Sequence, residues 1–450
     1  MPELAIVLHS HMPYVEGFGT YPFGEEWLFD AFARSHLPVL ESAQRLTMTV
    51  TPVLADQLEA DGVSERMLDF LRRHRLEPSE REGADSEAAR YRRAIESLEA
   101  GDGDALGPFR AAAGFGSVEL IPSAATHAVL PLLASRAGQR LQIDAGLRSH
   151  RRRFGRPRGW WLPECAYVPG VESLLAERGL AYTCVDPGIG ADDSTLAPIA
   201  LSGGVVGFAI DWPSVAVVWS EQGYPAHQDY LEHHRLSGEG TRLWAISGRR
   251  YDPEAAASRA REHAAAFLEA VAKRFAGRRG PTLCVFAIDT ELLGHWWAEG
   301  PIWLAEVLAQ AGSHGVQLLT LSEALERHQP QERPLATSSW GEGKSLETWD
   351  SPAVADLAWA ARRLELRLVR AVQARGLGPE TALRAARELL ALQSSDWAFM
   401  DHRGQAGDYP YGRATSHAQA LLEAIHSGQA PDPRMRNLAP DLVLAPLLET

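Results

Sequence analysis

Two acidic residues in apolar, aromatic surroundings are the first candidates for chemistry. Glu164 lies within GWWLPECAYVPG (159–170), and Asp289 ends the apolar run TLCVFAID (282–289). A retaining glycosidase needs one carboxylate as nucleophile and a second carboxyl group as acid/base, about 5–5.5 Å apart. An apolar setting raises the pKa of the acid/base by desolvation. The simpler alternatives are a solvent-facing strand end for Glu164 and a helix N-cap for Asp289, and Glu291 competes with Asp289.

Histidines follow other apolar runs in the same way. His9 and His11 come at the end of ELAIVLHSH, and His127 follows SVELIP. A His-x-His pair on a strand points both side chains the same way, so with His127 it could bind zinc, as in barrel deacetylases and zinc mannosidases. Those enzymes typically have an Asp in the first cluster, which this sequence lacks. Hydrogen bonds to the hydroxyls of a neutral ligand suit these histidines better, and we expect no metal and no cofactor.

Tryptophan is abundant, with thirteen Trp alongside ten Tyr, and several of the Trp lie in Gly- and Pro-rich loops. Exposed Trp can stack on the flat faces of sugar rings, whereas core packing is the simpler use. Two further segments are ambiguous on their own. SSWGEGKSLETW (338–349) could be a Gly-rich linker, and Trp397 in SSDWAF (394–399) could be a core residue.

Composition limits the possible partners. The chain has 450 residues and a net charge of −14, which argues against nucleic acid and favours a neutral ligand. Three scattered cysteines exclude a disulfide framework and indicate a reducing compartment. The N-terminal MPELAIVLHSH predicts neither a signal peptide nor an anchor, and no run approaches the roughly 18 apolar residues of a membrane span. We therefore expect a cytoplasmic protein with no membrane partner.

Short apolar runs and amphipathic helical patterns alternate up to about residue 325, which predicts a parallel sheet or barrel. The predicted strands are 3–10, 47–54, 117–122, 159–163, 180–186, 242–247, 282–289 and 315–320. The clearest helix begins at N-cap Asp252, with Pro253 at its first position, and ends at Gly277. Because functional groups gather at the carboxyl ends of barrel strands, the acidic residues and histidines above should share one rim.

The pattern changes after residue 350, where 353–375, 378–393 and 413–427 have helical periodicity with no strand between them. We therefore predict a catalytic domain at 1–328 with a small helical insertion near 76–107. A connection at 329–350 contributes to the cleft, and a helical domain follows at 351–450.

Five motifs occur in order: HSHMPYV, VELIPSAATHAVLPLL, WLPECAYVPG, AIDTELLGHWWAEG and SSWGEG. Together they resemble the five sequence motifs of glycoside hydrolase family 57. YPFGEEWLFDAF (21–32), VVWSEQGYP (217–225) and ALQSSDWAF (391–399) resemble its 1,4-α-glucan branching enzymes. The resemblance spans nearly the whole chain. It implies a (β/α)7 barrel with a C-terminal all-α helical domain, a retaining mechanism on α-glucans, and no metal.

The resemblance also implies roles for residues. Glu164 is the nucleophile, and Asp289, rather than Glu291, is the acid/base. His11, His127 and His295 fall in motifs that line the donor site. The other residues that we expect to bind substrate from these motifs are His9, Glu25, Trp161, Trp219, Trp296, Trp340, Asp396 and Trp397.

The acceptor stays open. A glucose 6-hydroxyl makes the enzyme a branching enzyme, water makes it an α-amylase-type hydrolase, and a 4-hydroxyl makes it a 4-α-glucanotransferase. Branching members carry a longer, Tyr-bearing loop where this chain has only PGIGADDSTLAPIALSGG (187–204), so hydrolysis is an alternative. Two other classes are a metal-dependent barrel deacetylase and a catalytically idle glucan-binding protein.

Overall fold

The apolar runs of the N-terminal three quarters of the chain form short strands in two sheets. The computed structural model describes residues 1–114, 116, 118–188, 193–277, 282–427 and 437–449. The first sheet has the order β3-β2-β1-β8, with β9 also paired to β1, and all its pairs are parallel. Its strands are β1 (Glu3–Ser10), β2 (Leu46–Val50), β3 (Val118–Ile121), β8 (Leu283–Asp289) and β9 (Gln317–Leu319).

The second sheet has the order β10-β6-β7-β5-β4, and only its β6–β7 pair is antiparallel. Its strands are β4 (Gly159–Trp160), β5 (Tyr182–Val185), β6 (Ile199–Ala200), β7 (Val206–Ala209) and β10 (Gln331–Glu332). Gly159 permits the close β4–β5 approach, because a Cβ there would lie 2.2 Å from the ring of Tyr182.

Two single backbone hydrogen bonds connect the sheets. The amide of Trp161, just after β4, donates to the carbonyl of Pro122, just after β3, at 2.9 Å. The amide of Asp211, just after β7, donates to the carbonyl of Val285 in β8, also at 2.9 Å. The strands β1, β2, β3, β4, β5, β7 and β8 thus follow one another around a ring. This arrangement is compatible with the expected seven-stranded barrel, and the predicted α/β class is confirmed.

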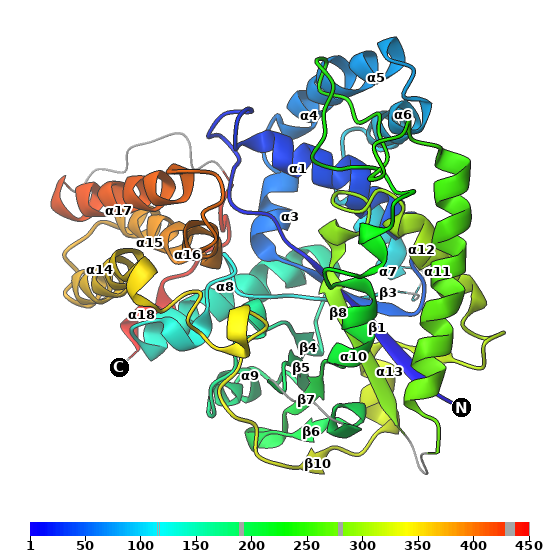
Figure 1. The fold of residues 1–450 in the computed structure, drawn as a ribbon. Coiled ribbons are helices and arrows are strands. Elements are labelled where there is room, and N and C mark those ends of the chain that lie inside the picture. Colours follow the sequence, from blue (N-terminus) through cyan, green and yellow to red (C-terminus); the bar gives the residue numbers. More distant parts are fainter. Residues whose placement is uncertain (115, 117, 189–192, 278–281, 428–436, 450) are drawn as a thin grey trace.

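Helices surround these sheets (Figure 1). They are α1 (Glu25–Ala31), α2 (Leu37–Ser42), α3 (Pro52–Leu58), α4 (Val63–Leu71), α5 (Glu77–Arg81), α6 (Asp85–Ala100), α7 (Gly107–Gly114), α8 (Arg136–Phe154), α9 (Glu172–Ala176), α10 (Trp212–Val218), α11 (Pro253–Arg274), α12 (Gly300–Gln310) and α13 (Leu321–Arg327). The predicted cap of α11 is confirmed, since Asp252 accepts hydrogen bonds from the amides of Glu254 and Ala255. Helices α4 to α6 form the peripheral part at the top of Figure 1.

Three details of the predicted elements were wrong. Residues 242–247 form no strand; they make isolated bridges, such as Leu236 with Arg242, within a long loop between α10 and α11. Strand β7 was not predicted, because Gly207 interrupts its short apolar run. The strand predicted at 47–54 ends at Val50, because Pro52 begins α3.

The C-terminal part is helical, as predicted, with α14 (Ala355–Gln373), α15 (Pro379–Leu392), α16 (Ser395–His402), α17 (Tyr409–Ser427) and α18 (Ala445–Leu448). Its apolar core, which includes Leu389 and Leu421, also takes in Leu141 and Ala145 of α8. The helical part therefore packs against the α/β part through α8, as Figure 1 shows. Sequence periodicity did not separate α16, which begins at Ser395 only three residues after α15 ends.

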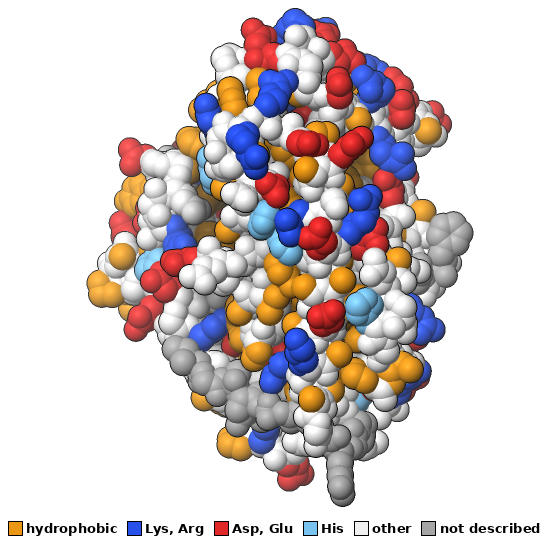
Figure 2. All heavy atoms as spheres, turned by 45° about the vertical axis from the view of Figure 1, so that its right-hand side comes forward, with side chains coloured by type: hydrophobic (Ala, Val, Ile, Leu, Met, Phe, Trp, Pro, Cys, Tyr) orange, Lys and Arg blue, Asp and Glu red, His pale blue; other side chains and the backbone are white. Residues whose placement is uncertain are grey.

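Surface charge is mixed. On the face in Figure 2, basic and acidic side chains are interspersed, without a large basic area. None of the described helices is both long and apolar enough to cross a lipid bilayer. Cys165, Cys184 and Cys284 are all free and buried.

Candidate active site

The backbone at Glu164 has an unusual conformation. Glu164 lies four residues after β4 with φ 59° and ψ 19°, and Cys165 and His127 also have positive φ, of 48° and 58°. Residues other than glycine rarely adopt this left-handed region, and such strain persists only where the surroundings enforce it. The strain directs the Glu164 side chain towards His127 and towards residues from two distant segments.

Three side chains hold the Glu164 carboxylate. Ser395 Oγ donates to Oε1 at 2.8 Å, Trp340 Nε1 donates to Oε2 at 3.0 Å, and His127 Nδ1 lies 3.4 Å from Oε1. Burial favours the neutral acid, but the contacts with His127, Ser395 and Trp340 outweigh it, so the pKa of Glu164 is below its usual value. Glu164 is therefore ionised at neutral pH, as a nucleophile must be.

The pKa of Asp289 is displaced in the opposite direction from that of Glu164. It is the last residue of β8 and pairs in register with His9 of β1. The residue is exposed, yet the surrounding protein removes most of the water from around the carboxyl group. This desolvation, followed by the charges of Glu291 and Glu164, raises the pKa of Asp289 to about 8. Asp289 therefore holds a proton at neutral pH, as a general acid must.

The three histidines stack beside these carboxyl groups. The ring centroid of His127 lies 4.2 Å from that of His11 and 4.8 Å from that of His9, and His9 lies 4.7 Å from Trp161. Asp396 binds His11 Nε2 at 3.0 Å, and Thr51 binds its Nδ1 at 3.1 Å.

Their charge states differ. Burial, followed by the neighbouring imidazoles, lowers the pKa of His9 well below its usual value and also lowers that of His127. Burial acts the same way on His11, but Asp396 outweighs it and raises its pKa. Both ring nitrogens of His9 and Nε2 of His127 are buried and have no protein partner among the described residues.

Glu291 is a buried neighbour of Asp289. Its Oε1 accepts hydrogen bonds from the backbone amide of His11 at 3.0 Å and from His36 Nε2 at 2.6 Å. Because both contacts use the same carboxyl group, Glu291 is held in place, whereas Asp289 is exposed. His36 carries no motif signal and was not predicted.

The segment 338–349 contacts the site directly. The amide of Trp340 donates to the carbonyl of Glu164 at 3.0 Å, beside the side-chain contact. Lys344 Nζ lies 2.9 Å from Asp186 Oδ2 and 3.0 Å from the centroid of the Trp212 ring, and Ser338 Oγ donates to the Asp186 carbonyl at 2.6 Å. This segment is therefore part of the site and not a free linker.

Among the described residues, no group of three or more His, Cys, Asp or Glu side chains has the geometry of a metal site. His9, His11 and His127 stack instead of converging on one point. The donor set therefore does not fit the zinc alternative.

Two family models match the chain: glycosyl hydrolase family 57 over residues 5–336, and the 1,4-alpha-glucan branching enzyme C-terminal region over residues 356–439. The chain belongs to glycosyl hydrolase family 57. It is similar to a 1,4-alpha-glucan branching enzyme of Thermococcus kodakarensis, with 33% identity over 92% of this chain and 72% of the relative. It is similar to a probable 1,4-alpha-glucan branching enzyme of Mycobacterium tuberculosis, with 34% identity over 93% of this chain and 90% of the relative.

Three solved structures resemble the whole chain. The crystal structure of the T. kodakarensis branching enzyme matches with a TM-score of 0.92 and 30% identity, over 100% of this chain and 96% of that one. A branching enzyme from Pyrococcus horikoshii matches with a TM-score of 0.90 and 30% identity, over 100% of this chain and 97% of that one. The α-amylase AmyC from Thermotoga maritima matches with a TM-score of 0.86 over 100% and 99% of the two chains, but at 24% identity this supports the fold alone.

The residues expected from the family-57 motifs fall into three groups. Those that lie together around the carboxyl groups are Glu164, Asp289, His9, His11, His127, Trp161, Trp340 and Asp396. Trp219 and Trp296 are exposed, by 56% and 49%, and Trp296 contacts the ring of His295.

Two other expected residues make different contacts. Glu25 on α1 is buried and forms an ion pair with Arg66, with Nη2 to Oε1 at 2.6 Å. Trp397 is 2% exposed and donates to the carbonyl of Ala391 within the helical core. Ser395, which lies next to Asp396 and which no motif argument singled out, is a second residue, after His36, that sequence reasoning missed.

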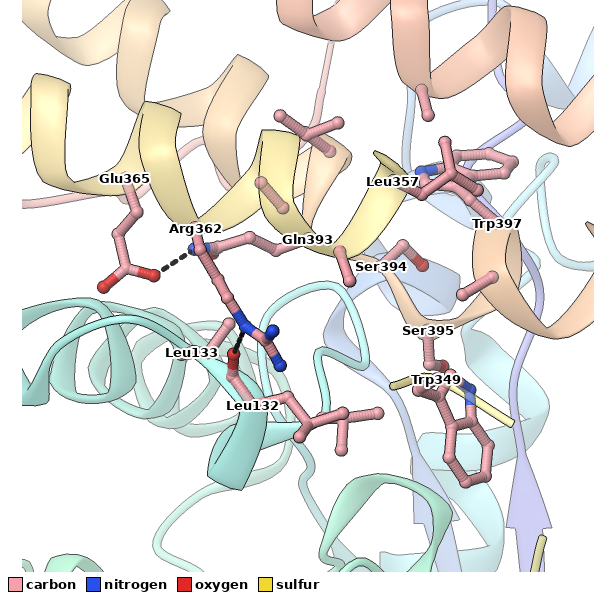
Figure 3. A pocket seen from close by; sticks show the side chains of 16 residues that line it. Leu132, Leu133, Trp349, Leu357, Arg362, Glu365, Gln393, Ser394, Ser395 and Trp397 are labelled. Carbon is pink, nitrogen blue, oxygen red and sulfur yellow. Dashed lines mark hydrogen bonds between the residues drawn. The ribbon is translucent and has the colours of Figure 1, made fainter. Parts of the chain in front are cut away.

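A pocket lies behind Ser395, between α14, the start of α16 and the turn at Leu130–Leu132 (Figure 3). Most of its lining is apolar. Arg362 Nε donates to the carbonyl of Leu132 at 2.9 Å, and Gln393 donates to Glu365 at 2.9 Å. Figure 3 draws both contacts: the first connects the helical part with the α/β part next to the site, and the second lies within the helical part.

Proposed function

We propose that this family-57 enzyme is a retaining 1,4-α-glucan branching enzyme, with Glu164 as nucleophile and Asp289 as acid/base. One observation carries the mechanism: two carboxyl groups of one site have pKa values displaced in opposite directions, with Glu164 below its usual value and Asp289 at about 8. Pairs of titratable groups with opposed environments divide acid and base roles between them.

The first step cleaves an α-1,4 bond. Glu164 attacks the anomeric carbon of the bound glucan, and the glycosidic C–O bond breaks as Asp289 donates its proton to the leaving oxygen. The products are a glycosyl ester on Glu164 and a shortened glucan. Ser395 and Trp340 hold the Glu164 oxygens during attack, so the reactive carboxylate keeps its orientation.

The second step transfers the chain. Asp289, now a carboxylate, accepts the proton of an acceptor 6-hydroxyl, whose oxygen attacks the anomeric carbon and releases Glu164. The result is an α-1,6 branch with net retention, because each of the two displacements inverts the anomeric centre.

Branching is favoured over hydrolysis and 4-α-transfer by the C-terminal match over residues 356–439 and by the named relatives. Residues 189–192 of the short loop at 187–204, on which the hydrolytic alternative rests, lie outside the described residues. The substrate that we propose is amylose, glycogen or a related α-glucan, and the location that we propose is the cytoplasm. The protein would then serve glycogen biosynthesis or a comparable pathway of glucan synthesis.

The test is incubation of the purified protein with amylose, with α-1,6 linkages followed by proton NMR and reducing ends measured in parallel. We expect new α-1,6 signal with few reducing ends. Reducing ends without α-1,6 signal would make the protein a hydrolase. Altered chain lengths with neither change would make it a 4-α-glucanotransferase.

A further inference from the structure

An exposed aromatic cluster lies on the acid/base side of the site. Trp296 follows Asp289 by seven residues, and its ring is 49% exposed. Its ring centroid lies 4.6 Å from His233, 5.0 Å from His295 and 6.1 Å from His234. His233 and His234 come from the loop between α10 and α11, so two distant segments build the cluster.

We propose that Trp296, with His233 and His234, forms a sugar-stacking platform that binds the acceptor α-glucan chain. The assignment deepens the proposed function and rests on it. A flat indole flanked by imidazoles offers an apolar face to a pyranose ring and polar ring edges to its hydroxyls.

The position favours the acceptor over the donor. Glu164 bonds to the anomeric carbon of the donor, whereas Asp289 protonates the leaving chain and later deprotonates the acceptor hydroxyl. The incoming chain must therefore approach along the Asp289 side. Trp296 is tied to this side, because its amide donates to the carbonyl of Glu291 at 3.2 Å.

The platform is rigidly supported on the β8 side. Gly294 has φ +104°, and a Cβ there would lie 1.8 Å from the carbonyl oxygen of Arg34, so only glycine fits this turn. The amide of Gly294 donates to the carbonyl of Trp297 at 2.7 Å, and Trp297 is buried. The turn therefore holds Trp296 outward, because Gly294 fixes the backbone before it and the buried Trp297 fixes the residue after it.

The loop between α10 and α11, which carries His233 and His234, is held by the partly buried side chain of Arg242. Arg242 Nε donates to the carbonyl of His233 at 3.0 Å, and its Nη1 lies 3.8 Å from Glu87, which also pairs with Arg34. At the far end of the loop, Arg250 donates to the carbonyl of Glu82 at 3.0 Å. The loop is thus held against α6 and the residues just after α5, shown next to each other in Figure 1.

The imidazoles suit neutral hydroxyls. Burial, followed by the charge of Arg242, lowers the pKa of His233, and burial lowers that of His295 to about 3. Nδ1 of each of these two rings is buried and has no protein partner among the described residues. Uncharged rings do not select for an anionic ligand.

The test compares transfer with hydrolysis for Trp296→Ala on amylose. Loss of a stacking ring should lower the ratio of transfer to hydrolysis by about tenfold, because water still reaches the glycosyl-enzyme when the acceptor binds poorly. Trp296→Phe, which keeps a ring, should retain most of the ratio. Trp359→Ala removes another exposed Trp, on α14, and should leave the ratio unchanged.

An unchanged ratio for Trp296→Ala, or equal losses in transfer and hydrolysis, would overturn the proposal. If the unaltered protein makes no transfer product, the proposed function fails. The platform is then tested separately, by calorimetric measurement of maltohexaose binding to the Glu164→Gln variant. In that background Trp296→Ala should weaken binding about tenfold, and an unchanged affinity would overturn the platform.

Discussion

Ser395 Oγ lies 2.8 Å from Oε1 of Glu164, across 231 residues of sequence. The same hydroxyl lies 2.9 Å from His127 Nδ1. Since the serine proton goes to Glu164, its oxygen accepts from Nδ1–H of His127, which leaves Nε2 of that ring free for a ligand. The N-terminal residue of α16 thereby fixes both the nucleophile and the tautomer of a neighbouring histidine, and the helical part completes the site.

Replacement of Ser395 by Ala should lower kcat by about 10- to 100-fold, because a hydrogen bond to a charged group is worth about 1.5–3 kcal/mol. The acidic limb of the pH–rate profile should also move to higher pH, since Glu164 loses a donor that favours its ionised form. Rates on amylose between pH 3 and 9 would measure both effects. Ser313→Ala, at an exposed turn, serves as the control. An unshifted acidic limb would show that Ser395 does not act on Glu164.

Replacement of Glu291 by Gln should lower the pKa of Asp289. The charge of Glu291 is the second cause of the raised value of about 8, after desolvation, and Glu164 and His11 stay in place. The alkaline limb of kcat/KM should lie near pH 8 in the unaltered protein and should move to lower pH in Glu291→Gln. Glu326→Gln, on an exposed residue, should leave the limb where it is. If the alkaline limb stays at the same pH in Glu291→Gln, the limb reports the ionisation of a group other than Asp289.

Asp289→Asn should stabilise the fold while abolishing glycosidic cleavage. The folded pKa of about 8 exceeds the ordinary 3.8, so the folded protein holds this proton more tightly than the unfolded chain does. Ionisation of Asp289 therefore costs stability, with no cost below about pH 4 and a growing cost up to about pH 8. The Tm of Asp289→Asn should exceed that of the unaltered protein at pH 8 and approach it at pH 4. A Tm difference independent of pH would contradict the raised pKa.

Lys344→Met tests how the segment 338–349 is held. It leaves the buried carboxylate of Asp186 without its cation, which should cost about 3 kcal/mol of unfolding free energy. Activity should fall as well, because the same segment carries Trp340 to Glu164. Denaturant unfolding measures the cost, and Arg93→Met in an exposed pair with Glu41 should cost less than about 1 kcal/mol. If the two variants lose equal stability, the Lys344 contact is not a stabilising anchor.

Much of the fold and the site could be predicted from the sequence. The runs ending at Ser10 and Asp289 are continuous and apolar because their strands are buried on both faces. Asp252 and Pro253 mark the start of α11 by local capping chemistry, which needs no tertiary information. Glu164 stood out because a carboxyl group inside an aromatic run requires partners.

The remainder depends on contacts between distant segments. Nothing local to Ser395 indicates that it meets Glu164, and nothing local to His36 indicates that it meets Glu291. Periodicity also misled at 242–247, where apolar residues pack as a loop on neighbouring side chains instead of joining a sheet. Burial of Trp397 in the helical core likewise follows from how α16 packs, which a motif does not encode.

The most direct test of the account is to trap the covalent intermediate. Maltosyl fluoride needs no acid catalysis to lose fluoride, so Asp289→Asn should still form the glycosyl-enzyme and then release it slowly for want of a base. Peptide mass spectrometry of the quenched protein should find one maltosyl ester, on Glu164. An ester on another residue, or fluoride release without any ester on Glu164, would contradict the assignment of Glu164 as the nucleophile.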